Sequence, residues 1–259
     1  MYESITDEIT IECSDLEDAE TLTSTDDCSN SSVEFTETRI DGSCDYQYTL
    51  KREWTATDEC GNETKRILNL NVIDTTAPTF TVPADITVEC DVDVNNLSIT
   101  GDVTDEADNC DTGLEATFTD SVADGACANE SVITRTWTLT DACGNTTTQA
   151  QTITIEDSTP PTFTVPASIT IECDQDSSDL TLTGDVTDEA DNCDTGLEAT
   201  FTDSIANGSC ENESIITRTW TLTDDCGNTT SQVQTITVQD TTAPTFTVPA
   251  SITIECDQD

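Results

Sequence analysis

The spacing of the cysteines constrains this chain more than any other feature. The sequence holds 13 cysteines, and Cys90, Cys173 and Cys256 follow one another at intervals of 83 residues. A fixed period of this length is typical of tandem repeats. The segment Gly101–Ser121 returns residue for residue at Gly184–Ser204, whereas the copy that begins the chain is shorter and diverged. We predict three repeats and the first strand of a fourth, at residues 1–74, 75–157, 158–240 and 241–259.

Within each repeat, apolar and polar residues alternate with a period of two. In the third repeat, Ile216, Arg218, Trp220 and Leu222 fall on one face of this pattern, and threonines occupy the positions between them. Such alternation is typical of half-buried strands, and no run shows the 3.6-residue period of a capped helix. Clusters of Gly, Asn, Asp and Ser separate the runs at intervals that favour a sandwich. We predict an all-β fold, with strands of the third repeat near residues 169–173, 180–183, 197–201, 216–222 and 235–238.

The charge of the chain excludes several classes of function. There are 54 Asp+Glu against 7 Lys+Arg and no His, which gives a net charge of −47. A nucleic-acid surface requires clustered basic residues, and an anionic membrane would repel this chain. No apolar run is long enough to span a bilayer. Because the sequence also lacks a nucleophile motif, we predict no catalytic activity, no nucleic-acid partner and no insertion into a membrane.

The cysteines indicate disulfides. Four cysteines in each repeat, without His or CxxC spacing, favour disulfides over zinc and therefore an oxidising, extracellular location. No secretory signal begins at Met1, so we expect a mature segment or a window cut from a longer chain. Strands that run alternately up and down place the first and third cysteines at one end of a repeat, and the second and fourth at the other.

Cystine Cα atoms must lie within about 7 Å of each other, so this placement favours pairing within one end of a repeat. Pairing of consecutive cysteines, first with second and third with fourth, stays open as the alternative. Cys256 is expected to have its partner beyond Asp259 or in a neighbouring chain. The favoured pairs are Cys13–Cys44, Cys28–Cys60, Cys90–Cys127, Cys110–Cys143, Cys173–Cys210 and Cys193–Cys226.

Acidic residues crowd the loop around the second cysteine of the second and third repeats. Oxygen ligands at this density suit Ca²⁺, which takes about 6–8 of them and would offset the repulsion among so many negative charges. A solvated acidic surface without bound metal is the alternative interpretation. The joint aspartates Asp74, Asp157 and Asp240 are expected near these loops. The candidate calcium ligands are Asp102, Asp105, Asp108, Asn109, Asp111, Asp141, Asp157, Asp185, Asp188, Asp191, Asn192, Asp194, Asp224 and Asp240.

An Arg and a Trp share one strand face in each repeat. The pairs are Arg52 with Trp54, Arg135 with Trp137 and Arg218 with Trp220, two residues apart. They could form a cation–π platform for a ligand. The interpretation that we favour is a core Trp with the Arg stem beside it and the guanidinium paired to a nearby carboxylate.

These motifs together resemble a known family of modules. The pattern TVPxxITxECD, DNCD and RTWTxTDxCGN followed by a Pro-containing joint is carried by Thr81–Asp91, Asn109–Asp111, Arg135–Asn145 and Ile153–Phe163. It is similar to the hyalin-repeat (HYR-like) class of immunoglobulin-like modules, in the four-cysteine form found many times over in giant secreted surface proteins of Bacteroidota. The first repeat departs from the pattern because it lacks both the joint segment and the DNCD loop.

The resemblance implies tandem immunoglobulin-like β-sandwiches arranged as an elongated rod. It implies a structural stalk or filament segment of a long cell-surface protein used for adhesion or surface motility, with neighbouring repeats or copies of itself as partners. A module that binds surface glycans or a receptor is one alternative, and a subunit that polymerises by strand donation is another. The joints resemble loosely the calcium-stiffened linker of cadherins. Hydroxyls that resemble the Bacteroidota O-glycosylation motif are Thr75, Ser121, Ser158, Ser204 and Thr241.

Overall fold

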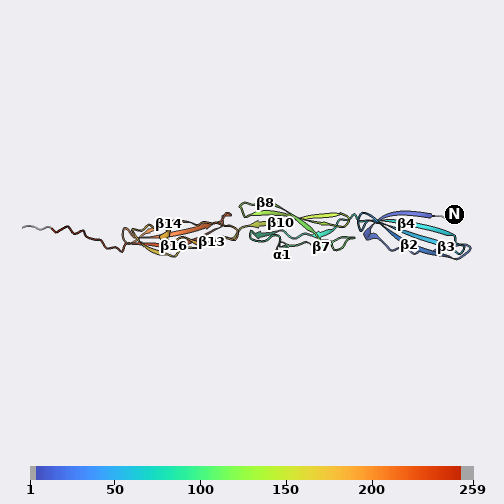
Figure 1. Cartoon of the computed structure of the whole chain (residues 1–259), viewed down its shortest axis with the longest axis horizontal. Coiled ribbons are helices and arrows are strands. Elements are labelled where there is room, and N and C mark those ends of the chain that lie inside the picture. The colour runs from blue at the N-terminus through green and yellow to red at the C-terminus, as the bar shows by residue number, and fades with distance from the viewer. Residues whose placement is uncertain (1–3, 252–259) are drawn as a thin grey trace, which may run out of the picture. The chain divides into compact units, whose positions relative to one another are not determined.

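A computed structural model describes residues 4–251 as an almost entirely β protein (Figure 1). The prediction of an all-β chain of tandem immunoglobulin-like repeats is confirmed, with two sheets in each of repeats 2 and 3 and one sheet in repeat 1. By their contacts, the residues divide into two compact units, one made of 1–125 and 130–156, the other of 126–129 and 157–259. Among residues 4–251, no helix has the length and apolar character needed to cross a membrane.

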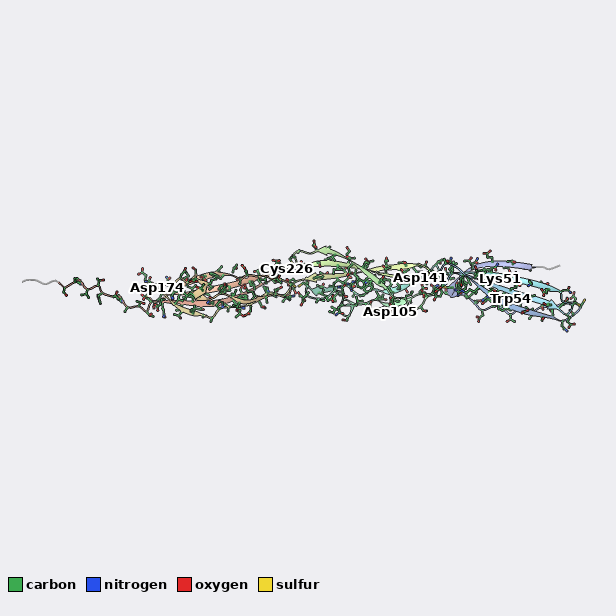
Figure 2. The ribbon with its side chains drawn as sticks, viewed as in Figure 1. Lys51, Trp54, Asp105, Asp141, Asp174 and Cys226 are labelled. Atoms are coloured by element: carbon green, nitrogen blue, oxygen red, sulfur yellow. A yellow bond between two sulfur atoms is a disulfide. The ribbon has the colours of Figure 1, made fainter. Side chains whose placement is uncertain are left out.

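Repeat 1 forms one four-stranded sheet. Its strands have the order β1-β4-β3-β2, with β1 parallel to β4 and the other neighbours antiparallel. The period of two in the sequence places Leu50, Arg52 and Trp54 on the buried face of β3. Figure 2 labels Trp54 within this sheet. The elements are β1 (Ser4–Glu12), a 3-10 turn (Cys13–Asp15), β2 (Ser31–Asp41), β3 (Tyr48–Asp58) and β4 (Glu63–Ile73).

Repeat 2 adds a second layer to the same kind of sheet. The four-stranded sheet has the order β6-β10-β9-β8, and a two-stranded sheet pairs β5 with β7. Phe80, Val103, Trp137 and Leu139 form a core cluster, in which each fully buried side chain contributes about 1.5–3 kcal/mol. The elements are β5 (Thr79–Thr81), β6 (Ile86–Glu89), α1 (Leu97–Thr100), β7 (Thr104–Ala107), β8 (Thr117–Asp124), β9 (Ser131–Thr140) and β10 (Thr146–Glu156).

Repeat 3 reproduces this arrangement in the second unit. The order β12-β16-β15-β14 and the pair β11-β13 match the sheets of repeat 2, and Phe163, Trp220 and Leu222 form the equivalent cluster. The elements are β11 (Thr162–Thr164), β12 (Ile169–Glu172), α2 (Leu180–Thr183), β13 (Thr187–Ala190), β14 (Thr200–Asn207), β15 (Ser214–Thr223) and β16 (Thr229–Gln239).

One predicted strand is wrong. Residues 180–183 form the single-turn helix α2, not a strand. The Asp179 carboxylate accepts the backbone N–H of Thr181 as an N-cap, and Gly184 follows at a φ of 89°. A capping Asp and a closing Gly are helix-end signals that the alternation of Leu and Thr obscured. The predicted strand at 197–201 also begins later, because β14 starts at Thr200.

The arginines on the central strands are buried ion-pair partners, as the favoured interpretation predicted. The Arg218 side chain is 0% exposed, and its Nε and Nη2 atoms lie 2.9 Å from the two carboxylate oxygens of Asp203. Arg135 makes the same bidentate pair with Asp120. The guanidinium of Arg218 also lies 3.9 Å from the centre of the Phe201 ring. These arginines therefore belong to the core, not to a ligand platform.

Candidate metal centre and the cystine joint

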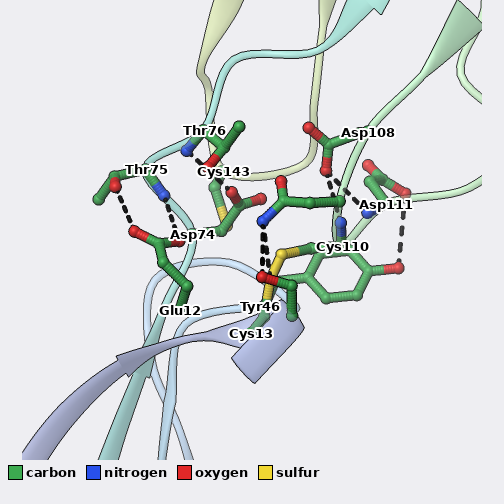
Figure 3. Close-up of a disulfide and its surroundings, with 12 residues drawn as sticks. Glu12, Cys13, Tyr46, Asp74, Thr75, Thr76, Asp108, Cys110, Asp111 and Cys143 are labelled. Carbon is green, nitrogen blue, oxygen red and sulfur yellow. Dashed lines mark hydrogen bonds between the residues drawn. A yellow bond between two sulfur atoms is a disulfide. The ribbon is translucent and has the colours of Figure 1, made fainter. Parts of the chain in front are cut away.

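Disulfides join consecutive repeats. In the first unit, Cys13 of repeat 1 is bonded to Cys110 of repeat 2 with a Cα–Cα distance of 5.8 Å (Figure 3). Cys44 is bonded to Cys143 at 5.1 Å. In the second unit, a bond of the same kind links Cys127 and Cys226 at 5.1 Å. Cys90 and Cys193 are also disulfide-bonded. Each of the bonds Cys13–Cys110, Cys44–Cys143 and Cys127–Cys226 therefore crosses from one repeat to the next.

All six predicted disulfide pairs are wrong. The sequence argument treated each repeat as a closed unit and paired cysteines that share one end. The joint is so short that the end of one repeat meets the beginning of the next, and the cystine distance is satisfied across the joint. Within residues 4–251, Cys28, Cys60, Cys173 and Cys210 are free and exposed. The incorrect pairs are Cys13–Cys44, Cys28–Cys60, Cys90–Cys127, Cys110–Cys143, Cys173–Cys210 and Cys193–Cys226.

Two Asp-containing turns form the side of repeat 2 that receives these bonds. The DxCGN turn lies between β9 and β10, as predicted, and the Asp141 carboxylate accepts the backbone N–H groups of Cys143 and Asn145 at 2.8 and 2.9 Å. In the other turn, the Asp108 carboxylate accepts the N–H groups of Cys110 and Asp111, each at 2.9 Å. Each aspartate therefore fixes the backbone that carries a bonded cysteine.

A third aspartate from the joint completes a buried acidic cluster. Asp74 follows β4, and one carboxylate oxygen each from Asp74, Asp108 and Asp141 lies within 4.8 Å of the others. Asp74 is 7% and Asp141 is 5% exposed. Oδ2 of Asp74 and Oδ2 of Asp108 are buried without a hydrogen-bond partner among the described residues. We call Asp74, Asp108 and Asp141 the first triad.

The second unit contains an equivalent cluster. Asp157, Asp191 and Asp224 bring three carboxylate oxygens within 4.8 Å of one another, and we call them the second triad. Asp157 is 5% exposed and Asp224 is 6% exposed. Both oxygens of Asp157 and Oδ2 of Asp191 and of Asp224 are buried without a hydrogen-bond partner in the described part of the chain. The same arrangement therefore occurs twice, in two separate units.

In each triad, the surroundings of the joint aspartate oppose its ionisation. Burial raises the pKa of Asp74 above its ordinary value of 3.8, and the neighbouring charges of Asp108 and Asp141 raise it further. Burial and the charges of Asp191 and Asp224 raise the pKa of Asp157 in the same way. Like charges held together away from water cost folding free energy unless a cation offsets them.

Residues 78–155 and 161–238 each match the family described as "HYR-like domain with 4 cysteines", and the two matches together span more than half of the chain. The chain belongs to this family. No curated protein matches the sequence. The two HYR-like matches lie in repeats 2 and 3, which carry the complete set of motifs described above.

Solved structures with a distant similarity are cadherin ectodomains. Drosophila N-cadherin EC1-4 has 12% identity and a TM-score of 0.24, over 92% of this chain and 74% of that chain. The human desmocollin-1 ectodomain has 13% identity and a TM-score of 0.27, over 77% and 48%. Human CDH23 EC21-23 has 14% identity and a TM-score of 0.27, over 73% and 73%. These similarities are too low to carry an argument about function.

The HYR-like triads use only some of the predicted calcium ligands. Asp108, Asp141, Asp157, Asp191 and Asp224 lie in the triads, and Asp74 joins them from a position that the sequence placed only near the loops. The signal for Asp74 is its place at the joint, four residues before the buried Pro78.

The other predicted ligands have different partners. Asp105 and Asp188 have φ angles near 59° and accept hydrogen bonds from neighbouring threonine hydroxyls. Asp111 and Asp194 accept the backbone N–H groups of Ala142 and Asp225 at 3.0 and 2.6 Å, which ties the two turns together. Four of the remaining predicted ligands make local contacts: Asp102 with Val103, Asp185 with Val186, Asn192 with Cys193 and Asp240 with Thr242. Asn109 instead donates to the hydroxyl of Ser14 in repeat 1, 95 residues away.

The predicted glycosylation hydroxyls divide into two kinds. The hydroxyls of Thr75 and Thr241 donate to Glu12 and Glu172, the residues before Cys13 and Cys173. These two therefore have a structural partner at the joint. Ser121 and Ser204 lie exposed on β8 and β14, and Ser158 is exposed after Asp157.

The donor set of the triads fits a hard divalent cation. All three ligands in each triad are carboxylates, and neither His nor thiolate is required, which suits Ca²⁺ better than zinc. The buried oxygens without hydrogen-bond partners are the atoms that would bind it. Three carboxylates supply only part of the coordination shell, so backbone oxygens or waters would complete it.

Proposed function

We propose that this HYR-like chain is a load-bearing segment of an extracellular stalk, in which disulfides and Ca²⁺ hold consecutive repeats together. The observation that carries the proposal is the direction of the disulfides, each of which crosses a joint instead of closing a repeat. Disulfides persist in oxidising, extracellular spaces. A stalk between a cell surface and an adhesive tip fits such a chain, and no step of this role requires catalysis.

The covalent connections supply a path that bypasses most of the chain. Tension applied at residue 13 passes through Cys13–Cys110, along residues 110–127, and through Cys127–Cys226. The residues that each bond encloses, 14–109 and 128–225, can unfold without lengthening the path. A stalk built in this way keeps its length under load even where a repeat opens.

Pulling on the two ends of single molecules should test this role. In the oxidised chain, the path between Cys13 and Cys226 should extend to about 60 Å, whereas in the reduced chain it should extend to about 750 Å, at roughly 3.5 Å for each residue. The variant Cys110→Ser removes the first bypass and should lengthen the oxidised chain as well. Equal extensions with and without reductant would contradict the proposal.

Calcium at the triads is the second part of the proposal. Asp74 and Asp157 belong to the joints, whereas their partners in each triad belong to the turns of the following repeat. A cation bound there would fix the joint to the repeat and remove the repulsion that raises the pKa of Asp74 and of Asp157. The proposed ligands are therefore the two triads, together with local oxygens.

The variant Asp157→Asn should have opposite effects with and without calcium. In chelator it removes one buried negative charge and should raise the melting temperature. At a calcium concentration near 100 times Kd, the parent chain should gain about 2.7 kcal/mol, or about 5–10 °C, and the variant should lose this gain. Calorimetry in chelator and in calcium measures the melting temperatures of the variant and of the parent chain. Asp188→Asn is the matched control, because Asp188 is an exposed acid outside the triad, and Asn tolerates its positive φ.

In the calcium-free chain, protonation of Asp157 at lower pH should stabilise the fold, as Asp157→Asn does in chelator. Because the pKa of Asp157 is raised, the folded state binds its proton more tightly than the unfolded state. The free energy of unfolding should therefore increase as pH falls through the raised pKa of the folded state, down to the ordinary value of 3.8. Groups with lowered pKa values, such as Asp58, lose their contribution only at more acidic pH. If Asp157→Asn left both the calcium response and this pH dependence unchanged, the triad would not be the site.

A groove in repeat 1 favours a second candidate function, self-assembly by strand donation. The groove is lined by Ile9, Leu22, Trp54 and Leu70, whereas in repeat 2 the equivalent Trp137 is packed against Phe80 of β5. The segment Thr245–Phe246–Thr247 has the same sequence as β5, and Phe246 is 94% exposed. We infer that this segment of another copy fills the groove, with Phe246 in the position that Phe80 takes in repeat 2.

A synthetic peptide of residues 241–251 tests the donated strand. The peptide should bind the chain with a Kd near the micromolar range by titration calorimetry, and a peptide with Phe246→Ala should bind at least tenfold more weakly, because it loses a buried aromatic ring. Equal binding of the two peptides, or none, would remove this candidate function.

A further inference from the structure

The four-stranded sheet of each repeat has an outer face, which points away from the buried side chains. In repeat 2 this face consists of every second residue of 117–123, 132–140 and 146–154, on β8, β9 and β10. In repeat 3 it consists of every second residue of 200–206, 215–223 and 229–237, on β14, β15 and β16. All of these side chains are half-buried or exposed, so both faces are open to a partner.

Neither of these two outer faces carries a charge. Their 28 positions hold only Thr, Ser, Ala, Val and Ile. Because 24% of the chain is charged, about seven charges would be expected among so many surface positions. The acids gather instead in turns such as those of Asp108 and Asp141. Two uncharged surfaces therefore occur on a chain with a net charge of −47.

The equivalent face of repeat 1 is charged. Lys51, Glu53 and Lys65 lie on the side of the sheet opposite the buried Leu50 and Trp54. Glu53 accepts hydrogen bonds from both lysines, at 2.9 and 2.8 Å. The same kind of sheet therefore accommodates charges on its outer face, and their absence is specific to repeats 2 and 3.

The side chains of the uncharged faces form an ordered layer. The hydroxyls of Thr140 and Thr146 share a hydrogen bond of 3.0 Å between β9 and β10, and those of Thr223 and Thr229 share one of 3.1 Å between β15 and β16. Threonine is also β-branched, which restricts its χ1 angle. A partner that contacts this layer would therefore cost little additional side-chain entropy.

A second copy of the chain is the partner that these faces fit. Two copies repel each other wherever their acidic surfaces meet, and least where two uncharged faces meet. Burying hydroxyls also costs less free energy than burying carboxylates. A basic partner would be drawn to the acidic turns instead. The faces are open and none of their 28 residues is aromatic, unlike the concave, aromatic-lined sites that bind small molecules.

The area of each face is that of a weak contact. Three strands about 4.8 Å apart, with a rise of about 3.3 Å for each residue, give a face of about 400 Å². A stable interface buries about 800 Å² on each partner, so a single face supports only a transient contact. Ile215 and Val233, which are 47% and 55% exposed, add apolar surface to the face of repeat 3. Repetition of the face along a stalk multiplies such contacts.

We propose that copies of this chain associate side by side, with the uncharged outer faces of repeats 2 and 3 packed against the same faces of a second copy. Sheets that pack face to face lie about 10 Å apart, which leaves room for interdigitated Thr and Ser side chains. The association uses neither the cystine joints nor the triads. It adds a lateral partner to the stalk, and it holds or fails independently of the load-bearing function.

Sedimentation velocity in chelator measures this association. The parent chain for the test carries Phe246→Ala, which removes the donated strand, and lacks thiols that could join two copies. It should form dimers with a Kd of about 100 µM. Raising the NaCl concentration from about 0.05 to about 0.5 M should tighten binding at least fivefold, because salt screens the repulsion between acidic surfaces. The thiol substitutions are Cys28→Ser, Cys60→Ser, Cys173→Ser, Cys210→Ser and Cys256→Ser.

Charges placed at the centre of each face identify the contact. Thr136→Asp with Thr219→Asp should weaken dimer formation at least tenfold, because like charges then meet across the interface. Thr136→Lys with Thr219→Lys should weaken it for the same reason. An equimolar mixture of the two variants should associate at least as tightly as the parent chain, since opposite charges then meet. Association in the mixture also shows that both variants are folded.

The charged face of repeat 1 provides the matched control. Thr55→Asp with Thr57→Asp adds the same charge to half-buried positions of that face, and its Kd should stay within about twofold of the parent value. A parent chain that stays monomeric up to about 1 mM would overturn the proposal. So would a control weakened as much as the Asp variant, or a mixture that does not associate. None of these outcomes would change the internal disulfides or their force bypass.

Discussion

Replacing Arg218 by methionine should lower the free energy of unfolding of repeat 3 by about 3–5 kcal/mol. The guanidinium is fully buried and donates to four oxygen atoms, two on Asp203, one on Thr183 and one on Ser177. The substitution removes every one of these donors and leaves Asp203, whose side chain is 25% exposed, without its countercharge. The stacking of the guanidinium on Phe201 is lost as well.

Urea unfolding followed by tryptophan fluorescence measures this loss. Arg66→Met is the control, because Arg66 pairs with Asp7 at 3.6 Å with both side chains about half exposed, and such surface pairs contribute about 0–1 kcal/mol. The double variant Arg218→Met with Asp203→Leu should recover part of the loss, since an apolar pair often replaces a buried ion pair at little cost. A loss for Arg218→Met no larger than for Arg66→Met would refute the assignment of Arg218 to the core.

Replacing Cys44 and Cys143 together by serine should cost the first unit up to about 4.7 kcal/mol, because the bond closes a loop of nearly 100 residues in the unfolded chain. The bond also couples repeats 1 and 2, so its loss should separate their unfolding. We expect calorimetry to resolve two transitions in the variant where the oxidised parent chain has one.

The free cysteines provide the matched control. The variant Cys28→Ser with Cys60→Ser removes the same number of thiols from the same repeat, but both are exposed and unbonded in the described chain. Its free energy of unfolding should stay within about 0.5 kcal/mol of that of the parent chain. It should also keep a single unfolding transition. If the two double variants behaved alike, Cys44–Cys143 would not couple the repeats.

Much of the fold and part of the site could be predicted from the sequence. The period of two placed β15 and β16 and identified the buried face of Trp220 and Arg218, because side chains on a strand alternate between faces whatever the strand packs against. It failed at Leu180–Thr183, where a cap at Asp179 and Gly184 produced a helical turn from an alternating pattern. The acidic loops correctly indicated oxygen-rich clusters, but most acids there serve as turn caps.

The sequence by itself determined the period, the all-β character, the acidic surface and the oxidised state expected of the cysteines, since each depends on residue type and local spacing. Only the tertiary structure decided which cysteines bond and which aspartates meet. Those contacts join residues such as Cys13 and Cys110, or Asp74 and Asp141, that are brought together by a short joint between two folded repeats. The spacing of residues within one repeat does not show which of them meet residues of the next repeat at the joint.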